Sequence, residues 1–393
     1  MQDTRQRFEF LERHKLDKVI EQGERLSKGS WELTTQLQAR LELDNPELTP
    51  FAAGKGLHLL SLSRCNLPKH LIDLAESTLR ARPTAVEFPT GKGQVLCRDD
   101  AAGDPASLGI ACLIYALAED NDVEKGRMKE DEKLTVKGVS MMQAVEAEIE
   151  FLDKSAYRTH DGAISHRLGH VSLWADFVYM VPPFYAFYGL TQSSDDAQIR
   201  YFQKAYDQCR LYRDHLRRAD GLWKHIIMGP DKIDPWPWAT SNGWAAAGML
   251  RVLAMMGKAN EQVQNQLQSQ MTDLGNWARE IVEATAKRVT DAGMVKEYID
   301  EPDFEGESCG TALLAYAAYR LAHLNVTSEF IPFAERARQE VSNLIKPDGL
   351  LDKVCDIVDE RKWRESSAEG QAFVVLLEAA ARDYWKAKER SVK

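Results

Sequence analysis

Residues 197–218, AQIRYFQKAYDQCRLYRDHLRR, indicate the fold class, because their apolar side chains recur three and four positions apart. On an α-helix this spacing gathers the apolar side chains on one face and leaves the other face charged. Residues 308–322, SCGTALLAYAAYRLA, show the same period. Working outward from these two stretches, we predict helices near 5–27, 32–42, 69–82, 106–118, 138–153, 173–189, 195–218, 241–257, 261–288, 309–322, 329–345 and 366–387.

Strand signals are few. Residues 94–98, QVLCR, and 294–299, MVKEYI, alternate only weakly, so we predict an all-α protein. About a dozen helices follow one another without a clear linker, which favours paired helical hairpins in one closed assembly, a single domain over 1–393. A superhelical solenoid would need repeats that resemble one another, and these segments do not. The long aromatic loops at 83–105, 155–172 and 219–240 are where we expect functional residues.

Charge and composition limit the classes of function. The chain carries 50 Lys and Arg against 60 Asp and Glu, a formal charge of −10, which argues against a nucleic-acid partner. No apolar run approaches the ~20 residues that span a membrane, and the first residues lack the apolar core of a secretory signal. The six cysteines have no CxxC spacing, so we expect free thiols in the cytoplasm, with no metal and no cofactor.

Asp176 lies in the aromatic stretch RLGHVSLWADFVYMVPPFYAFYG, residues 167–189, which we expect to be helical. An ionised carboxyl among apolar groups needs a partner or a raised pKa. One interpretation is a carboxylate near a helix N-terminus, where the helix dipole favours it. The other is a general acid whose pKa is raised by its aromatic neighbours. The residues alone leave both open.

A tryptophan cluster forms a second candidate, in residues 235–254, PWPWATSNGWAAAGMLRVLA. Trp236, Trp238 and Trp244 come just before or within the start of a predicted helix, with Ser241 or Asn242 as its N-cap. Tryptophan is a common core residue, but indoles beside a polar Ser-Asn-Gly turn also suit a sugar ring that stacks on them. We favour the sugar-binding interpretation.

Two histidines and two further acids complete the candidates. His166 and His225 each follow an Asp-Gly turn in a long aromatic loop, so we expect them to contact substrate rather than to be ordinary surface residues. No metal-ligand spacing accompanies either. Asp104 and Glu307 precede predicted helices, where an N-cap role is the simpler alternative. Serine-hydrolase, dinucleotide and P-loop motifs are absent from the sequence.

Taken in order, several blocks resemble those of the unsaturated uronyl hydrolases, glycoside hydrolase families 105 and 88. These blocks are LWADFVYMVPPFYAFYG, GDPASLGIA, GAISHR, GLWKH, WATSNGW and ESCGTALLAYA. The resemblance runs from about residue 100 to the C-terminus. It implies an (α/α)6 barrel of six helical hairpins.

The same resemblance assigns roles to residues. Asp176, in the Trp-x-Asp block with Trp174, would be the catalytic acid/base, and Asp104 a second active-site acid. His166, His225, Trp174, Trp238 and Trp244 would contact the sugar.

One block departs from the family pattern. Thr240 and Ser241 stand where the family has Arg and Gly. Because a hydroxyl does not replace a bidentate guanidinium, recognition of the uronate carboxylate must come from elsewhere, with the Thr240 and Ser241 hydroxyls as candidates, or the substrate differs.

The implied reaction is a hydration. A protonated Asp176 would donate to C4 of a terminal 4,5-unsaturated uronic acid, water would add at C5, and the hemiketal would open to release the linked sugar. The expected partner is therefore an oligosaccharide with a terminal unsaturated uronate, bound by a monomer or homodimer. The alternatives are a conventional glycosidase that uses Asp104 and Asp176 on a saturated glycoside, and a sugar-binding barrel without catalysis.

Overall fold

A computed structural model describes residues 9–52, 62–230, 232–303, 305–355 and 362–392. Residues 5–8 of the first predicted helix lie outside this part. The helices are α1 (Arg13–Leu26), α2 (Ser30–Asp44), α3 (Lys69–Ala81), α4 (Gly103–Ser107), α5 (Gly109–Glu124), α6 (Met141–Lys154), α7 (Phe177–Leu190), α8 (Asp195–Leu216), α9 (Ala239–Met256), α10 (Glu261–Gln266), α11 (Gln268–Ala286), α12 (Ser308–His323), α13 (Ile331–Asn343) and α14 (Ala368–Val392).

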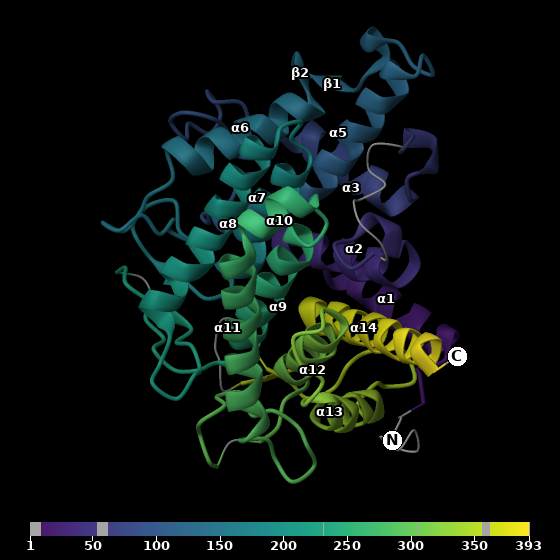
Figure 1. The fold of residues 1–393 in the computed structure, drawn as a ribbon, viewed down its shortest axis with the longest axis vertical. Coiled ribbons are helices and arrows are strands. Elements are labelled where there is room, and N and C mark those ends of the chain that lie inside the picture. Colours follow the sequence, from purple (N-terminus) through teal and green to yellow (C-terminus); the bar gives the residue numbers. More distant parts are fainter. Residues whose placement is uncertain (1–8, 53–61, 231, 304, 356–361, 393) are drawn as a thin grey trace.

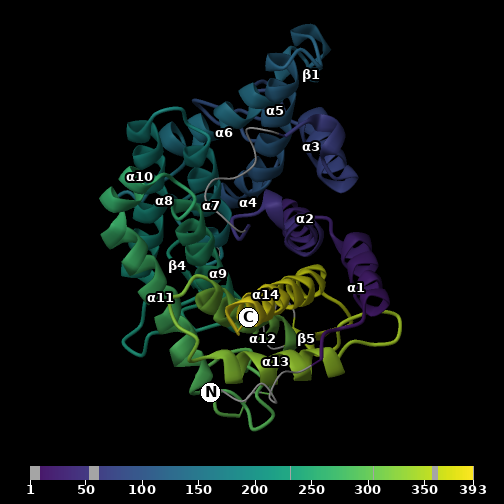
Figure 2. The same ribbon diagram turned by 45° about the vertical axis from the view of Figure 1, so that its right-hand side comes forward.

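The helices form two concentric rings (Figures 1 and 2). In the inner ring, α2, α4 with α5, α7, α9, α12 and α14 follow one another, and α14 closes the ring against α2. The outer helices α1, α3, α6, α8, α11 and α13 each pack on an inner neighbour. Within the described residues this is a single domain of six helical hairpins, so the predicted (α/α)6 barrel is confirmed.

The sequence explains which helices lie inside. All residues of α9 from Ala239 to Met256 are buried, whereas α8 buries one face only. A helix that is apolar all round must be surrounded by other helices, and an amphipathic one can cover them. Gly248 lets α9 approach α7 closely: a Cβ at this position would lie 2.1 Å from the carbonyl oxygen of Val178.

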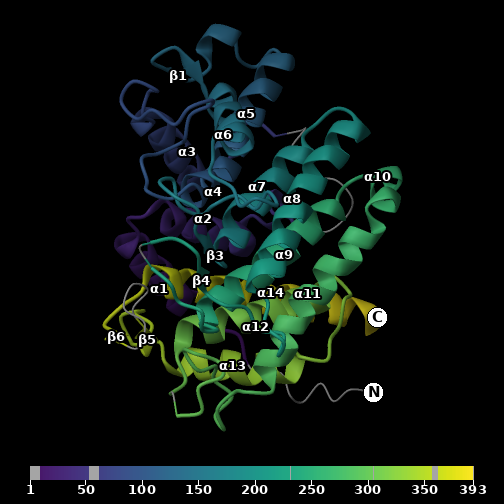
Figure 3. The ribbon, with the colours of Figure 1, turned by 90° about the vertical axis from the view of Figure 1, so that its left-hand side faces the viewer.

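Six two-residue strands lie in the segments between the helices of the described part of the chain and form three pairs: β1 (Thr135–Val136) with β2 (Val139–Ser140), β3 (Leu173–Trp174) with β4 (Ile226–Ile227), and β5 (Val354–Cys355) with β6 (Trp363–Arg364). All three pairs are antiparallel, and Figure 3 shows β3 beside β4. Neither weak strand signal, at 94–98 or 294–299, forms a strand.

Several predicted helix boundaries change, among them those of the first helix, which begins at Arg13, and of the last, which runs on to Val392. The helix expected from residue 173 begins at Phe177, because Leu173 and Trp174 pair with Ile227 and Ile226 across the two strands. The helix expected over 261–288 is divided at Leu267 into α10 and α11. The helix expected over 106–118 is preceded by the separate turn of helix α4 and runs on to Glu124.

No helix in the described part of the chain has the length and apolar character needed to cross a membrane. The six cysteines are free thiols, and four of them are buried: Cys112, Cys209, Cys309 and Cys355.

Candidate active site

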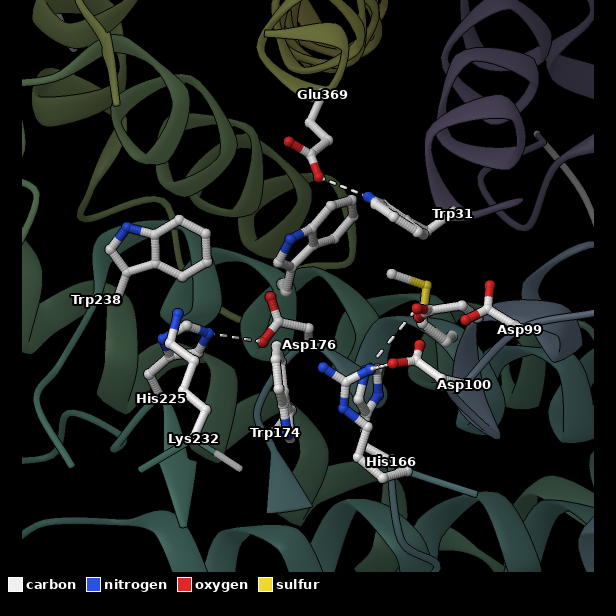
Figure 4. A pocket seen from close by; sticks show the side chains of 14 residues that line it. Trp31, Asp99, Asp100, His166, Trp174, Asp176, His225, Lys232, Trp238 and Glu369 are labelled. Atoms are coloured by element: carbon white, nitrogen blue, oxygen red, sulfur yellow. Dashed lines mark hydrogen bonds and ion pairs between the residues drawn. The ribbon is translucent and has the colours of Figure 1, made fainter. Parts of the chain in front are cut away.

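A pocket of about 250 Å³ opens where the N-terminal ends of the inner helices meet (Figure 4). The starts of α2, α4, α7, α9 and α14 each bring at least one side chain to it. Helix N-termini carry partial positive charge, so this end of the barrel suits acids and anionic ligands. The lining residues are Trp31, Asp99, Asp100, Asp104, His166, Arg167, Trp174, Asp176, Met180, His225, Lys232, Trp238, Trp244 and Glu369.

Asp176 lies directly before α7 and points into the pocket (Figure 4). Asp176 is the N-cap residue of α7, so the helix dipole favours its carboxylate as one interpretation expected, but its side chain makes no capping hydrogen bond to the helix. The pairing of β3 with β4 places Asp176 beside His225, since Ala175 N donates to His225 O at 2.9 Å. Among the described residues Asp176 forms an ion pair with the His225 imidazole, whose Nε2 lies 3.5 Å from Asp176 Oδ2, too long for a strong hydrogen bond.

His225 stands between two carboxyls. Its Nδ1 lies 2.8 Å from Asp234 Oδ2 on the side away from Asp176. The ring is 1 % exposed, so the surface interpretation of this histidine is excluded. Burial alone would lower the pKa of His225, but the carboxyls of Asp176 and Asp234 raise it to about 9.

Asp104 lies in the first turn of α4 rather than at its N-cap, which is Ala102. Its Oδ2 is 3.9 Å from His166 Nε2, and both residues are buried. Burial, reinforced by the neighbouring Asp99 and Asp176, raises the pKa of Asp104 well above the usual range of an aspartate. Burial also lowers the pKa of His166 to about 3, so this histidine is neutral near pH 7.

Aromatic rings surround these groups. The Trp174 ring stacks on His166 with centroids 4.9 Å apart, and the Trp238 ring lies 4.6 Å from that of His225. Trp174 Nε1 donates to Ser172 Oγ at 2.9 Å, which fixes the plane of its indole. The pocket therefore combines acids with flat apolar surfaces, as a sugar site requires.

The structure brings together seven of the nine residues that the family resemblance placed at the site or made candidates for binding the carboxylate. Asp104, His166, Trp174, Asp176, His225, Trp238 and Trp244 all line the pocket.

Thr240 and Ser241 are not among the lining residues, which differs from their expected contact with a carboxylate. Both are buried in the first turn of α9, where the Ser241 hydroxyl donates to Trp238 O. Glu307 also lies elsewhere: it caps α12 by accepting from Cys309 N and Gly310 N, as its simpler interpretation predicted.

Sequence reasoning missed half of the lining. Trp31 and Glu369 come from α2 and α14, at opposite ends of the chain, and the Trp31 indole donates to Glu369 Oε1 at 2.7 Å (Figure 4). Burial raises the pKa of Glu369 to about 7. Each residue stands in the first turn of a helix, Trp31 after Gly-Ser and Glu369 after Ser-Ala, and that position was the available signal.

The two cationic side chains of the lining were missed as well. Arg167 pairs with Asp100 at 2.7 Å, and its guanidinium lies 4.4 Å from the centre of the Trp174 ring. Lys232 extends beside His225 (Figure 4). Arg167 is paired with Asp100, and Asp100 lies on the opposite side of Asp176 from Lys232 in that view. The two cations therefore reach the pocket from different sides.

Among the described residues no three His, Cys, Asp or Glu side chains are grouped so that they could hold a metal ion.

The family model for Glycosyl Hydrolase Family 88 matches residues 127–365, which is more than half of the chain. No curated protein sequence matches this chain.

Several solved structures share the fold. A possible member of the GH105 family from Klebsiella pneumoniae aligns with a TM-score of 0.63 at 19 % identity, covering 96 % of this chain and 95 % of that one. A family 88 glycosyl hydrolase from Bacteroides vulgatus aligns at 0.61 and 14 % identity, covering 94 % and 97 %. A family 105 glycoside hydrolase from Clostridium acetobutylicum aligns at 0.60 and 16 % identity, covering 94 % and 98 %.

Proposed function

The chain belongs to Glycosyl Hydrolase Family 88 and is a glycoside hydrolase, and on that premise we propose that it removes a 4,5-unsaturated uronic acid from the non-reducing end of short oligosaccharides. The reaction is hydration of the vinyl ether in the unsaturated ring. The aglycone is the remainder of an oligosaccharide that a polysaccharide lyase has produced, because only eliminative cleavage leaves this double bond.

The observation that carries the proposal is the position of Asp176. Its carboxyl points into a pocket walled by indoles and, among the described residues, has a histidine rather than an arginine or lysine as its ion-pair partner. A carboxyl that must protonate carbon needs a partner with which it can exchange a proton, and an imidazole is such a partner. A guanidinium or an ammonium group, whose pKa lies above about 10, gives up its proton far less readily.

In the proposed mechanism Asp176 gives its proton to C4 of the bound ring, and positive charge develops at C5 and the ring oxygen. The resulting carboxylate then takes a proton from water as the water oxygen bonds to C5. The hemiketal at C5 opens without further catalysis, and the linked sugar leaves. Asp104, whose pKa is raised by burial, stays protonated and can donate a hydrogen bond to a sugar oxygen.

Arg167 and Lys232 are the groups that we propose for the uronate carboxylate. They are the Lys and Arg side chains among the described residues that line the pocket. Arg167 is already paired with Asp100, whose own side chain is 81 % exposed, so a substrate carboxylate could share the guanidinium. Lys232 lies beside His225 and Trp238, close to the acid that acts on the ring.

The test is an assay with unsaturated disaccharides from pectin, rhamnogalacturonan, glycosaminoglycans and gums that carry glucuronic acid. Loss of the enol-ether absorbance reports hydration. We expect turnover of at least one disaccharide by the wild type and a loss of roughly a thousandfold or more in Asp176→Asn, because the amide has no proton to give. Asp214→Asn, an exposed acid of α8, is the matched control and should keep full activity.

The competing reaction is hydrolysis of a saturated glycoside by Asp104 and Asp176 as an acid–base pair. Turnover of saturated aryl glycosides, with every unsaturated disaccharide left intact, would replace our proposal by that one.

We propose that the reaction takes place in the cytoplasm, where lyase products are taken up. In support, the six cysteines are free, as is usual in a reducing compartment.

A further inference from the structure

Behind Asp176 the pocket contains a chain of side chains that the proposed reaction has not yet used. His225 Nδ1 lies 2.8 Å from Asp234 Oδ2, and the Tyr298 hydroxyl donates to the same oxygen at 2.9 Å. Trp236 N lies 3.4 Å from Asp234 Oδ1. Asp234 is 6 % exposed and does not line the pocket, but it contacts His225, which does.

We propose that Asp234, held by Tyr298, is a positioning residue that keeps a proton on His225 Nδ1 and thereby directs His225 Nε2 at Asp176. This inference rests on the proposed function, in which Asp176 is the acid. Asp234 and Tyr298 would then control when Asp176 holds a proton, without touching the substrate.

The geometry determines the tautomer. An ionised Asp234 can only accept hydrogen bonds, so the His225 nitrogen that faces it must carry a hydrogen. Nε2 is then the nitrogen that gains or loses a proton, and it faces Asp176 Oδ2 at 3.5 Å. The proton on Nε2 is therefore the one that His225 can pass to Asp176.

Proton transfer follows from this arrangement. The proton on Nε2 moves to Asp176 and then to C4 of the ring as the C4=C5 π bond breaks. Water bonds to C5 and returns one proton to the Asp176–His225 pair, so the protein ends in its starting state. Asp234 keeps its charge throughout and stabilises the imidazolium, as the buried aspartate does in a Ser-His-Asp triad.

Charges around His225 agree with this role. Although burial opposes ionisation, hydrogen bonds from His225 and Tyr298 hold the pKa of Asp234 below its usual range. The raised pKa of His225, about 9, is the expected result of two carboxyls around one imidazole. Among the described residues, the titratable and charged groups near this imidazole include Asp176, Asp234, Tyr298, His166 and Lys232.

The experiment is an NMR titration of the His225 imidazole in the full-length protein, with its signal assigned by comparison with His225→Gln. In Asp234→Asn we expect the His225 pKa to fall from about 9 towards the free-imidazole value of roughly 6.5. Tyr298→Phe should lower it less. Asp234→Glu should restore most of it, because the charge returns.

A matched pair of controls is available on the outer helices. The Tyr206 hydroxyl donates to Asp273 Oδ2 at 2.7 Å, a tyrosine–aspartate pair without a histidine. Asp273→Asn and Tyr206→Phe should leave the titration of His225 unchanged. The alkaline limb of the kcat profile should move to lower pH in Asp234→Asn and stay in place in these controls.

An unchanged His225 pKa in folded Asp234→Asn protein overturns the proposal. If Asp234→Asn does not fold, an unchanged pKa in Tyr298→Phe overturns it equally. The proposed substrate fails in a different way: the wild type would then leave every unsaturated disaccharide intact while the His225 titration still responded to Asp234→Asn, and the positioning role would stand.

Discussion

The side chains that line the pocket include more acids than bases. Its lining holds five carboxyls, Asp99, Asp100, Asp104, Asp176 and Glu369, against two permanent cations, Arg167 and Lys232, and the His225 imidazole, whose pKa is about 9. Burial raises the pKa values of Asp99, Asp104 and Glu369, so part of this negative charge is neutralised by protons. An anionic sugar is therefore repelled less than the residue count suggests, and the placement of the two cations decides its orientation.

Lys232→Met tests that placement. The methionine keeps most of the apolar stem of the side chain and removes its charge, so we expect KM for the unsaturated disaccharide to rise roughly ten- to hundredfold, the usual cost of a charged hydrogen bond. The change in kcat should be much smaller, because Lys232 binds the carboxylate in both ground and transition states. Steady-state kinetics on the best disaccharide of the assay measures both constants.

Lys69→Met is the control for this variant. Lys69 pairs with Asp73 on α3, and its side chain is 84 % exposed. Equal KM values in wild type and Lys232→Met would show that the carboxylate is bound elsewhere, and Arg167 would then be the remaining pocket cation among the described residues.

Residues with local signals were predictable, and residues assembled by distant contacts were not. Asp176, His225 and Trp238 stand in blocks whose order indicates a family. Lys232 has no such block, and Trp31 meets Glu369 only because the barrel closes across 338 positions of sequence. No local pattern predicts which helix ends will meet when a ring closes.

The helices differ in how well the sequence predicts their bounds. The period of residues 197–218 predicts α8 well, since nothing competes with its amphipathic face. The predicted start of α7 at residue 173 was wrong. Trp174 pairs with Ile226, which lies far along the chain, and this strand pairing overrides the helical propensity of residues 173 and 174. That same pairing places Asp176 beside His225, so the residue at which propensity fails belongs to the active site.

Gly248→Ala tests how α7 and α9 hold the site. Its Cβ would lie 2.1 Å from Val178 O, and a backbone atom on a packed helix cannot move aside cheaply. We expect a loss of about 2 kcal/mol in the free energy of unfolding, in the range for overpacking a core. Activity per folded molecule should also fall, because the displaced α7 begins directly after Asp176.

Urea denaturation and kinetics at a temperature below the transition measure these two effects. Gly169→Ala is the control, since nothing lies within 4 Å of the added carbon. A fully stable and fully active Gly248→Ala protein would mean that the two helices are not in the close contact described.

Over the whole molecule, a buried ion network ties the inner ring together. Glu42 of α2 contacts Arg251 of α9 and Arg320 of α12, with Arg320 Nη2 2.6 Å from Glu42 Oε2. Arg320 reaches Asp383 of α14 at 2.8 Å. Four inner helices therefore share one group of charges far apart in sequence.

Removal of the central carboxylate should loosen this ring. Glu42→Gln leaves two buried guanidinium groups without a full counter-charge, which costs about 3–5 kcal/mol in comparable pairs. We expect a lower Tm by calorimetry, whereas Glu47→Gln, an exposed neighbour, should melt like the wild type. A Glu42→Gln protein with an unchanged Tm would contradict a structural role for the network.

The pH dependence of stability follows from acids that are buried in the neutral form. Burial raises the pKa of Glu148 and that of Glu307 to about 8, although Leu96 N donates to Glu148 and backbone N–H groups donate to Glu307. In the unfolded chain both ionise near 4.5. Between these values the folded protein holds protons that the unfolded chain has lost, so the free energy of unfolding falls as pH rises from about 5 to 8, by up to ~1.4 kcal/mol per pH unit for each acid.

Glu148→Gln removes one titrating group, and we expect a shallower fall by urea denaturation and a variant more stable than wild type above about pH 8. Glu146→Gln, exposed on the same helix, should follow the wild-type curve; stability that is constant or rises over this range would show that Glu148 is ionised in the folded protein, with its charge compensated by a partner.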